Sequence, residues 1–245
     1  APSWRSHRGS YRDTLIVDGA LVPDRRYHDA QEALMASDRE PSQQWELGYG
    51  QAWVFTNGDD LVTPVVLAAD VQDGPTDMAA VVAGLDHESY SFLSALRAAD
   101  RDLVLLGYRY GNARLVEDVT AVTECVSRTT AERRGDTPLA VGGVGRGAAM
   151  TCYSLVRMEY ERRDHETATY FSYNGSALSK DEAEQLNIWV GWPQRPLKLK
   201  AVSGEFKDEL NDDDFDDTKV GAPNSGGALI TRELGSWIID KLSTR

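Results

Sequence analysis

The sequence is poor in cysteine and has no long apolar run, and each scarcity removes a class of protein. Its two cysteines among 245 residues, Cys125 and Cys152, have no C-x-x-C or Cys/His neighbourhood, so neither a disulfide framework nor a metal site is expected. No stretch approaches the roughly 18 to 20 apolar residues of a membrane-spanning helix. Residues 1–13 lack the apolar core of a signal peptide. Cytoplasm is the default location, and because the chain begins at Ala1, secretion of a processed chain stays open.

Positive charge is also in deficit. Lysine and arginine total 26 against 39 aspartates and glutamates, which leaves a net charge of −13. Nucleic acid and anionic membrane surfaces are poor partners for such a chain, because both bind clustered cations. The hydrophobic content of 41% is that of a globular protein. We therefore expect a soluble protein without a cofactor, whose partner is a small-molecule ligand or substrate, and the oligomeric state cannot be read from the sequence.

Apolar runs and helical patterns alternate along most of the chain. Continuous apolar runs at 64–70 and 102–108 are typical of parallel strands covered on both faces. Further strands are expected at 14–19, 51–58, 138–142, 167–175 and 196–204, and helices at 88–101, 112–134, 146–163 and 228–242. This alternation predicts an α/β fold with a doubly wound, mainly parallel sheet. We expect one domain over 1–245, with an irregular segment at 1–50.

The most informative stretch is PLAVGGVGRG (138–147), a strand that runs into a glycine-rich turn and a helix. The nucleophile elbow, G-x-S-x-G, has this form, because its flanking glycines let strand and helix pack closely while the central side chain projects into a pocket. Here the five residues are Gly-Val-Gly-Arg-Gly, from Gly143 to Gly147. Both flanking glycines are present, and Gly145 stands where the serine should be.

At this point the chain resembles the α/β-hydrolase superfamily of esterases and lipases, over roughly residues 50–243. PVVLAADVQDGP (64–75) resembles the strand and loop that help to form the oxyanion hole. KLKAVSGEFKDEL (198–210) resembles the strand that presents the catalytic acid, and VGAPNSGGAL (220–229) resembles the loop that carries the catalytic histidine. The resemblance implies an α/β-hydrolase sheet with the elbow at its carboxyl edge.

The departures from that pattern affect the catalytic positions themselves. Gly145 has no side chain and cannot form an acyl-enzyme. The histidine position is filled by Asn224 or Ser225, and all four histidines precede residue 166. Glu205 and Asp208 are the candidates for the acid. Because serine and histidine are both missing, a naturally degenerate triad is favoured over an engineered one.

Backbone donors can remain without a triad. The resemblance implies that N–H groups near Val71 and Gln72 point at the elbow, together with the N–H of Arg146 at a helix N-terminus. Loss of the serine and histidine side chains is expected to leave an enlarged pocket above Gly145. Further candidates for its lining are Tyr108, Trp189 and Trp192, the two tryptophans in a possible lid at 175–195.

Several features have a second interpretation. Gly143, Gly145 and Ala148 also fit the G-x-G-x-x-A dinucleotide fingerprint, but the strand that follows ends at Asn174 rather than at an acid that could hold a ribose. The acidic run at 208–217 lacks the spacing of an EF-hand and is interpreted as a solvated loop. His165 is expected to be exposed at a charged helix end.

Three classes of function follow from these residues, and we favour the first, because the glycines that keep the elbow open are retained. The first is a non-hydrolytic enzyme, such as a cyclase, lyase or isomerase, that binds a small carbonyl-containing substrate through backbone oxyanion donors. The second is a non-catalytic pseudo-hydrolase that acts as a binding or interaction protein, and the third is an esterase whose nucleophile was replaced by Gly145. An open pocket beside Gly145 favours the first class, and a position filled by a side chain argues against it.

Overall fold

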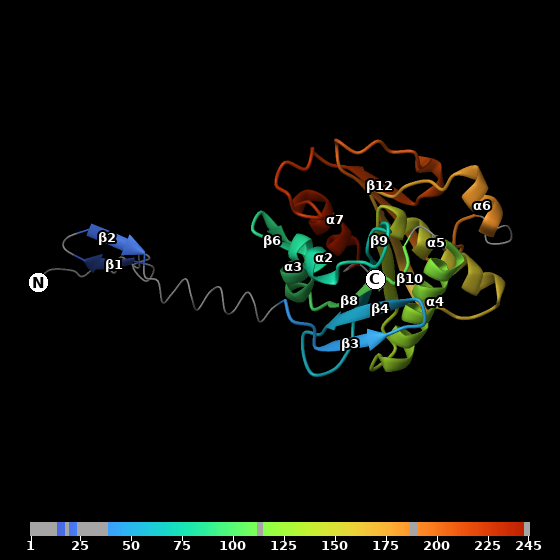
Figure 1. Ribbon diagram of the computed structural model, residues 1–245, viewed down its shortest axis with the longest axis horizontal. Coiled ribbons are helices and arrows are strands. Elements are labelled where there is room, and N and C mark those ends of the chain that lie inside the picture. The colour runs from blue at the N-terminus through green and yellow to red at the C-terminus, as the bar shows by residue number, and fades with distance from the viewer. Residues whose placement is uncertain (1–13, 18–19, 24–38, 112–114, 187–190, 243–245) are drawn as a thin grey trace, which may run out of the picture. The chain divides into compact units, whose positions relative to one another are not determined.

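The computed structural model describes residues 14–17, 20–23, 39–111, 115–186 and 191–242 (Figure 1). The chain divides into two units, residues 1–40 and 41–245. In the first unit, β1 (Thr14–Val17) pairs antiparallel with β2 (Ala20–Pro23). The elements described below belong to the second unit.

A sheet of eight strands forms the centre of the described part of the second unit. Its strands are β3 (Gln43–Glu46), β4 (Gly50–Phe55), β5 (Pro64–Ala68), β8 (Asp102–Tyr108), β9 (Leu139–Val144), β10 (Thr167–Tyr173), β11 (Leu197–Val202) and β12 (Asp217–Val220). Their spatial order is β12-β11-β10-β9-β5-β8-β4-β3. β4 runs antiparallel to β3 and β8, and the remaining neighbours are parallel. The predicted doubly wound, mainly parallel sheet is confirmed.

Helices cover both faces of this sheet (Figure 1). They are α2 (Met78–Leu85), α3 (Phe92–Ala98), α4 (Leu115–Glu132), α5 (Arg146–Tyr160), α6 (Lys180–Leu186) and α7 (Arg232–Leu242), with a short hairpin of β6 (Asp86–His87) and β7 (Tyr90–Ser91) between α2 and α3. Alternate residues of the buried strands point to opposite faces. One set packs with α4, α5 and α6, and the other with α2, α3 and α7. The sheet therefore separates two apolar cores. The carboxyl ends of its parallel strands form the edge at which the candidate site lies.

The acidic run at 208–217 is largely exposed, as the sequence predicts, but it is also held in place by contacts with Lys200. Lys200 on β11 is almost fully buried, and its ammonium donates to Asp208 Oδ2 at 2.6 Å and to the Leu210 carbonyl at 2.7 Å, with Asp212 as a second ionic partner. Burial acts against the charge of Lys200, but the two carboxylates outweigh it and raise its pKa. The run contains a short 3-10 helix and leads into β12. Attraction to a buried cation thus fixes a segment whose composition alone indicates a loop.

The expectation that His165 is exposed is wrong. Its side chain is buried, its Nε2 lies 3.3 Å from Glu159 Oε1, and its Nδ1 accepts the N–H of Thr167 at 3.1 Å. Positive φ angles at Arg162 and Glu166 turn the chain back from α5 into β10. This reversal carries His165 under the end of the helix, which the charged sequence around it does not reveal.

Candidate functional site

The turn between β9 and α5 has the backbone of a nucleophile elbow. Gly145 adopts φ 56° and ψ −127°, and α5 begins at the next residue. A Cβ at Gly143 would lie 2.5 Å from the amide nitrogen of Ala148, and one at Gly147 would lie 2.9 Å from the carbonyl carbon of Ala69. Strand, turn and helix approach too closely for larger residues there, which is the reason that the motif requires glycine on both sides.

The carboxylate of Asp70 fills the space in which a nucleophile would stand. A Cβ built on Gly145 would lie 2.6 Å from Asp70 Cγ and closer still to Oδ1. Oδ1 also accepts the backbone N–H of Arg146 at 2.8 Å. The expectation of an enlarged, empty pocket above Gly145 is therefore wrong. The Arg146 N–H, expected as an oxyanion donor, already has an anionic acceptor from its own chain.

Asp70 lies two residues after the end of β5, at the carboxyl edge of the sheet. Burial raises the pKa of its carboxyl above the usual value of 3.8, against the opposing effect of the Arg146 and Val71 backbone amides and of the Arg146 charge. Val71 is buried, whereas Gln72 is exposed and lines a cavity of about 200 Å³ together with Asp70. The sequence predicted that backbone N–H groups near Val71 and Gln72 point at the elbow, and this stays a prediction. The group that lies above Gly145 is the Asp70 carboxylate.

The Arg146 side chain connects the elbow to α6 and is partly buried. Its Nη2 donates to Glu182 Oε1 at 2.6 Å, and this hydrogen bond is the main reason that the pKa of Glu182 falls to about 2. Its Nε is buried and has no hydrogen-bond partner among the described residues. Arg146 therefore acts at two points, with its amide on Asp70 and its guanidinium on α6.

Two further polar groups near Arg146 are buried without partners. The Tyr108 hydroxyl and both carboxylate oxygens of Asp118 make no hydrogen bond within the described part of the chain. Burial raises the pKa of Asp118 to about 7, with the Arg146 charge lowering it and the Glu117 charge raising it. The sequence singled out Tyr108 and missed Asp118. The available signal was a charge on the apolar stripe of the helix at 112–134.

The residues predicted for the acid and histidine positions have structural partners. Glu205 accepts the Asn224 backbone N–H at 2.8 Å and the Ser203 hydroxyl at 2.9 Å. The Asn224 side-chain amide donates to the Ala228 carbonyl at 2.7 Å. Asp208, as described above, pairs with Lys200. Glu205 and Asn224 thus fasten the loop after β12, and Asp208 anchors the acidic segment.

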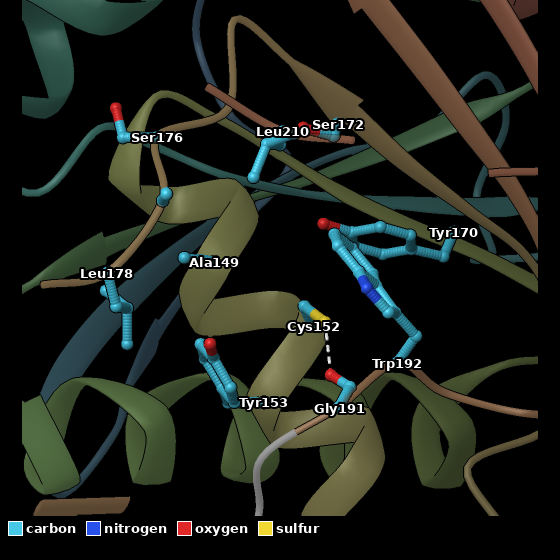
Figure 2. Close-up of a pocket in the computed structure, with 11 residues that line it drawn as sticks. Ala149, Cys152, Tyr153, Tyr170, Ser172, Ser176, Leu178, Gly191, Trp192 and Leu210 are labelled. Carbon is cyan, nitrogen blue, oxygen red and sulfur yellow. Dashed lines mark hydrogen bonds between the residues drawn. The ribbon is translucent and has the colours of Figure 1, made fainter. Parts of the chain in front are cut away.

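The predicted lid contains α6 and Trp192, while Trp189 lies outside the described residues. The Trp192 ring packs edge-on against Phe215 with the centroids 4.7 Å apart, and lies at a tilt to Tyr170 with the centroids 6.3 Å apart. Figure 2 shows Trp192 and Tyr170 side by side at one wall of a cavity that extends along α5. This cavity has a volume of about 230 Å³.

Comparison with solved structures identifies the architecture. The esterase LipW from Mycobacterium marinum is similar with a TM-score of 0.54 at 12% identity, covering 90% of this chain and 86% of that one. An esterase from Pyrobaculum calidifontis gives 0.54 at 12%, over 90% and 92%, and a hormone-sensitive lipase from a metagenome library gives 0.52 at 11%, over 88% and 90%. The fold is that of the α/β-hydrolases. No protein-family model matches the sequence, and no curated protein matches it either.

The α/β-hydrolase fold places the predicted segments in the expected order. β9 leads into the elbow, Asp70 follows β5, Glu205 follows β11, and Asn224 follows β12. In the residues that the structure describes, no group of three or more His, Cys, Asp or Glu side chains is arranged to hold a metal ion. No helix in the same residues is long and apolar enough to cross a bilayer.

Proposed function

We propose that this chain is a non-catalytic pseudo-hydrolase that binds a small molecule. The observation that carries the proposal is the Asp70 carboxylate, which fills the position above Gly145 and accepts the Arg146 N–H. Covalent hydrolysis needs a nucleophile, a base and free oxyanion donors. Gly145 supplies no nucleophile, and the loop expected to supply the base carries no histidine of its own, although the His87 ring lies beside its Gly227. One oxyanion donor, the Arg146 N–H, is already hydrogen-bonded to a carboxylate.

Charge strengthens this argument. An oxyanion hole stabilises negative charge as it develops in the transition state. When ionised, Asp70 presents a negative charge at the same amide, so a developing oxyanion would be repelled rather than stabilised. A filled position beside Gly145 is also the arrangement that argues against the enzyme hypothesis formed from the sequence. The lining of the cavity along α5 offers a place for a ligand instead.

Assays with short-chain p-nitrophenyl esters test the proposal. The full chain and the variants Gly145→Ser and Gly145→Ser/Asp70→Ala should show no hydrolysis above buffer. The double variant is the decisive one, because removal of Asp70 frees both the space and the Arg146 N–H for a restored serine. Strong turnover by either serine variant would overturn the proposal and favour an esterase with a replaced nucleophile.

A second candidate function is acid–base catalysis by Asp70 on a small carbonyl compound. It is favoured by the raised pKa of this carboxyl and by the cavity of about 200 Å³ beside it. In such a reaction the carboxylate would take a proton from the carbon next to the carbonyl and return it. Proton exchange of small ketones in deuterium oxide, followed by NMR, should then be faster with the protein than with Asp70→Asn. Equal rates would leave only the binding proposal.

A further inference from the structure

The cavity along α5 combines apolar walls with two polar side chains that have no partner. Tyr153 and Cys152 approach from α5, Tyr170 from β10, and Leu178, Trp192 and Leu210 from the segments that follow β10 and β11 (Figure 2). Its volume of about 230 Å³ exceeds the ~150 Å³ cavity that holds benzene in an engineered protein. Benzene has six non-hydrogen atoms, so a cavity larger in this proportion holds about nine.

The walls favour a neutral ligand. No lining residue in the described part of the chain carries a formal charge. Glu159 and Glu182, whose charges act on Cys152 and Tyr153, accept hydrogen bonds from the Gln194 N–H and from Arg146. The Cys152 thiol is buried, and burial raises its pKa well above the usual value, so it adds no anion. Because a buried charge without a partner is costly, an ionised ligand would bind poorly here.

The aromatic side chains favour a planar ring. Tyr170 and Trp192 lie at 55° to each other, so their surfaces form an angled wall rather than a flat one. Phe215 packs against Trp192 and limits its movement. Aromatic rings prefer edge-to-face or offset contacts, which contribute beyond the area that they bury. A ring inserted beside this pair would make such contacts, whereas a saturated ring of equal size would not.

Two hydroxyl groups provide the polar contacts. The Tyr153 hydroxyl makes no hydrogen bond within the described residues, and Figure 2 shows it directed toward the cavity. Burial raises the pKa of Tyr153 to about 12, so the group keeps its proton and can donate it. The Ser172 side chain is fully buried, lines the same cavity, and has an oxygen without a partner in the described chain. Buried polar groups of this kind usually have a partner.

We propose that this cavity binds a neutral, single-ring aromatic molecule that carries one hydrogen-bond acceptor, such as a carbonyl oxygen, which accepts from the Tyr153 hydroxyl. The inference rests on the proposed function and names the class of its ligand. The cavity takes its walls from the carboxyl half of β10 and from α5, and the Ser176 N–H at its rim donates to the Gly145 carbonyl at 3.3 Å. The ligand site therefore adjoins the elbow without using its vacant nucleophile position.

Four compounds of similar size test the proposal on the full chain. Acetophenone is the expected ligand, α-methylstyrene has its shape without the oxygen, cyclohexyl methyl ketone has the oxygen without the aromatic ring, and benzoate adds a charge. Binding is followed by NMR at the Trp192 indole N–H, assigned with Trp192→Phe. Acetophenone should bind about twofold to tenfold more tightly than cyclohexyl methyl ketone and about threefold to tenfold more tightly than α-methylstyrene. Benzoate should bind most weakly.

Variants locate the site. Tyr153→Phe should remove the preference for acetophenone over α-methylstyrene, because the proposal assigns the donor for the carbonyl oxygen to the Tyr153 hydroxyl. Ala149→Leu and Leu178→Phe enlarge side chains at two different walls and should each weaken binding at least tenfold. Ala79→Leu, at an exposed position of α2, is the matched control and should bind as the unaltered chain does. Circular dichroism identifies any variant that fails to fold, and the second filling variant then decides.

Absence of acetophenone binding, equal affinity for cyclohexyl methyl ketone, or binding unchanged by both filling variants would overturn the inference. These results leave the elbow assays untouched. Conversely, ester turnover by the serine variants would overturn the pseudo-hydrolase proposal while the NMR titration still reported on the cavity. The two failures are therefore distinguishable.

Discussion

Replacing Asp118 by asparagine should stabilise the folded protein at pH 8 and have less effect at pH 5. The Asp118 carboxyl is buried without a hydrogen-bond partner among the described residues, and burial raises its pKa from 3.8 to about 7. At pH 8 the wild-type carboxylate is ionised in both states, and the folded state bears the cost of burying that charge. Asparagine has nearly the same shape and no charge, so it removes this cost.

The magnitude follows from the pKa. A tenfold change in an acid dissociation constant is worth about 1.36 kcal/mol, so the rise from 3.8 to about 7 corresponds to roughly 4 kcal/mol. Solvent screening near the start of α4 reduces this value, and we expect about 2 kcal/mol at pH 8. The folded pKa is raised, so the cost is complete above pH 7 and disappears as the pH falls toward 3.8. At pH 5 the difference should be below about 1 kcal/mol.

Urea unfolding of the wild type and of Asp118→Asn at both pH values measures this difference directly. Asp59→Asn removes an exposed carboxylate and serves as the control, with no effect above about 0.5 kcal/mol at either pH. A gain of stability that is equal at pH 5 and pH 8 would refute the electrostatic reasoning. So would a wild type that is the more stable protein at pH 8, because Asp118 would then have a stabilising partner.

Three other substitutions test individual buried contacts of the fold, each by urea unfolding. Gly145→Ala should cost at least about 2 kcal/mol, because a side chain at φ 56° is strained and meets Asp70, and Asp70→Ala should restore part of that loss. Lys200→Met should lower the free energy of unfolding by about 2 kcal/mol or more, because it leaves the carboxylate partners without a cation. Lys198→Met removes a less buried ion pair and should lower it less. Asp102→Asn should cost about 2 kcal/mol or more, since its buried carboxylate accepts three backbone N–H groups. A loss below about 0.5 kcal/mol in any of them would contradict the contact that it removes.

The sequence predicts the sheet well where strands are buried on both faces. β8 spans the expected range, 102–108, and all seven of its residues are buried. A short, continuous apolar run is typical of a strand that is covered on both faces. β12 was missed, because its side chains are only partly buried and its neighbours are acidic. α2 was missed for the opposite reason. Its residues, MAAVVAGL, are apolar throughout and show no helical stripe.

The sequence predicts where the elbow lies, but not which side chain lies above it. The glycines of the elbow gave the strand, the turn and the start of α5, because close backbone approach limits the residues that can stand there. Which side chain lies above Gly145 depends on a contact between Asp70 and a turn that is 75 positions away in the sequence. Local pattern cannot predict such a contact. The buried carboxylate of Asp118 did have a local signal, its position on the apolar stripe of α4, and that signal was not used.

The fit between Asp70 and Gly145 bears on whether a nucleophile could stand in the elbow. Removing a serine side chain from a working elbow would leave a hollow and a free amide. Here the hollow is occupied and the amide is hydrogen-bonded, and a side chain at 145 would collide with the group that occupies it. The two residues depend on each other, so Gly145 is part of a packed arrangement rather than a simple deletion. This mutual dependence supports the proposal of a pseudo-hydrolase, and it directs the search for function from the elbow to the cavity beside it.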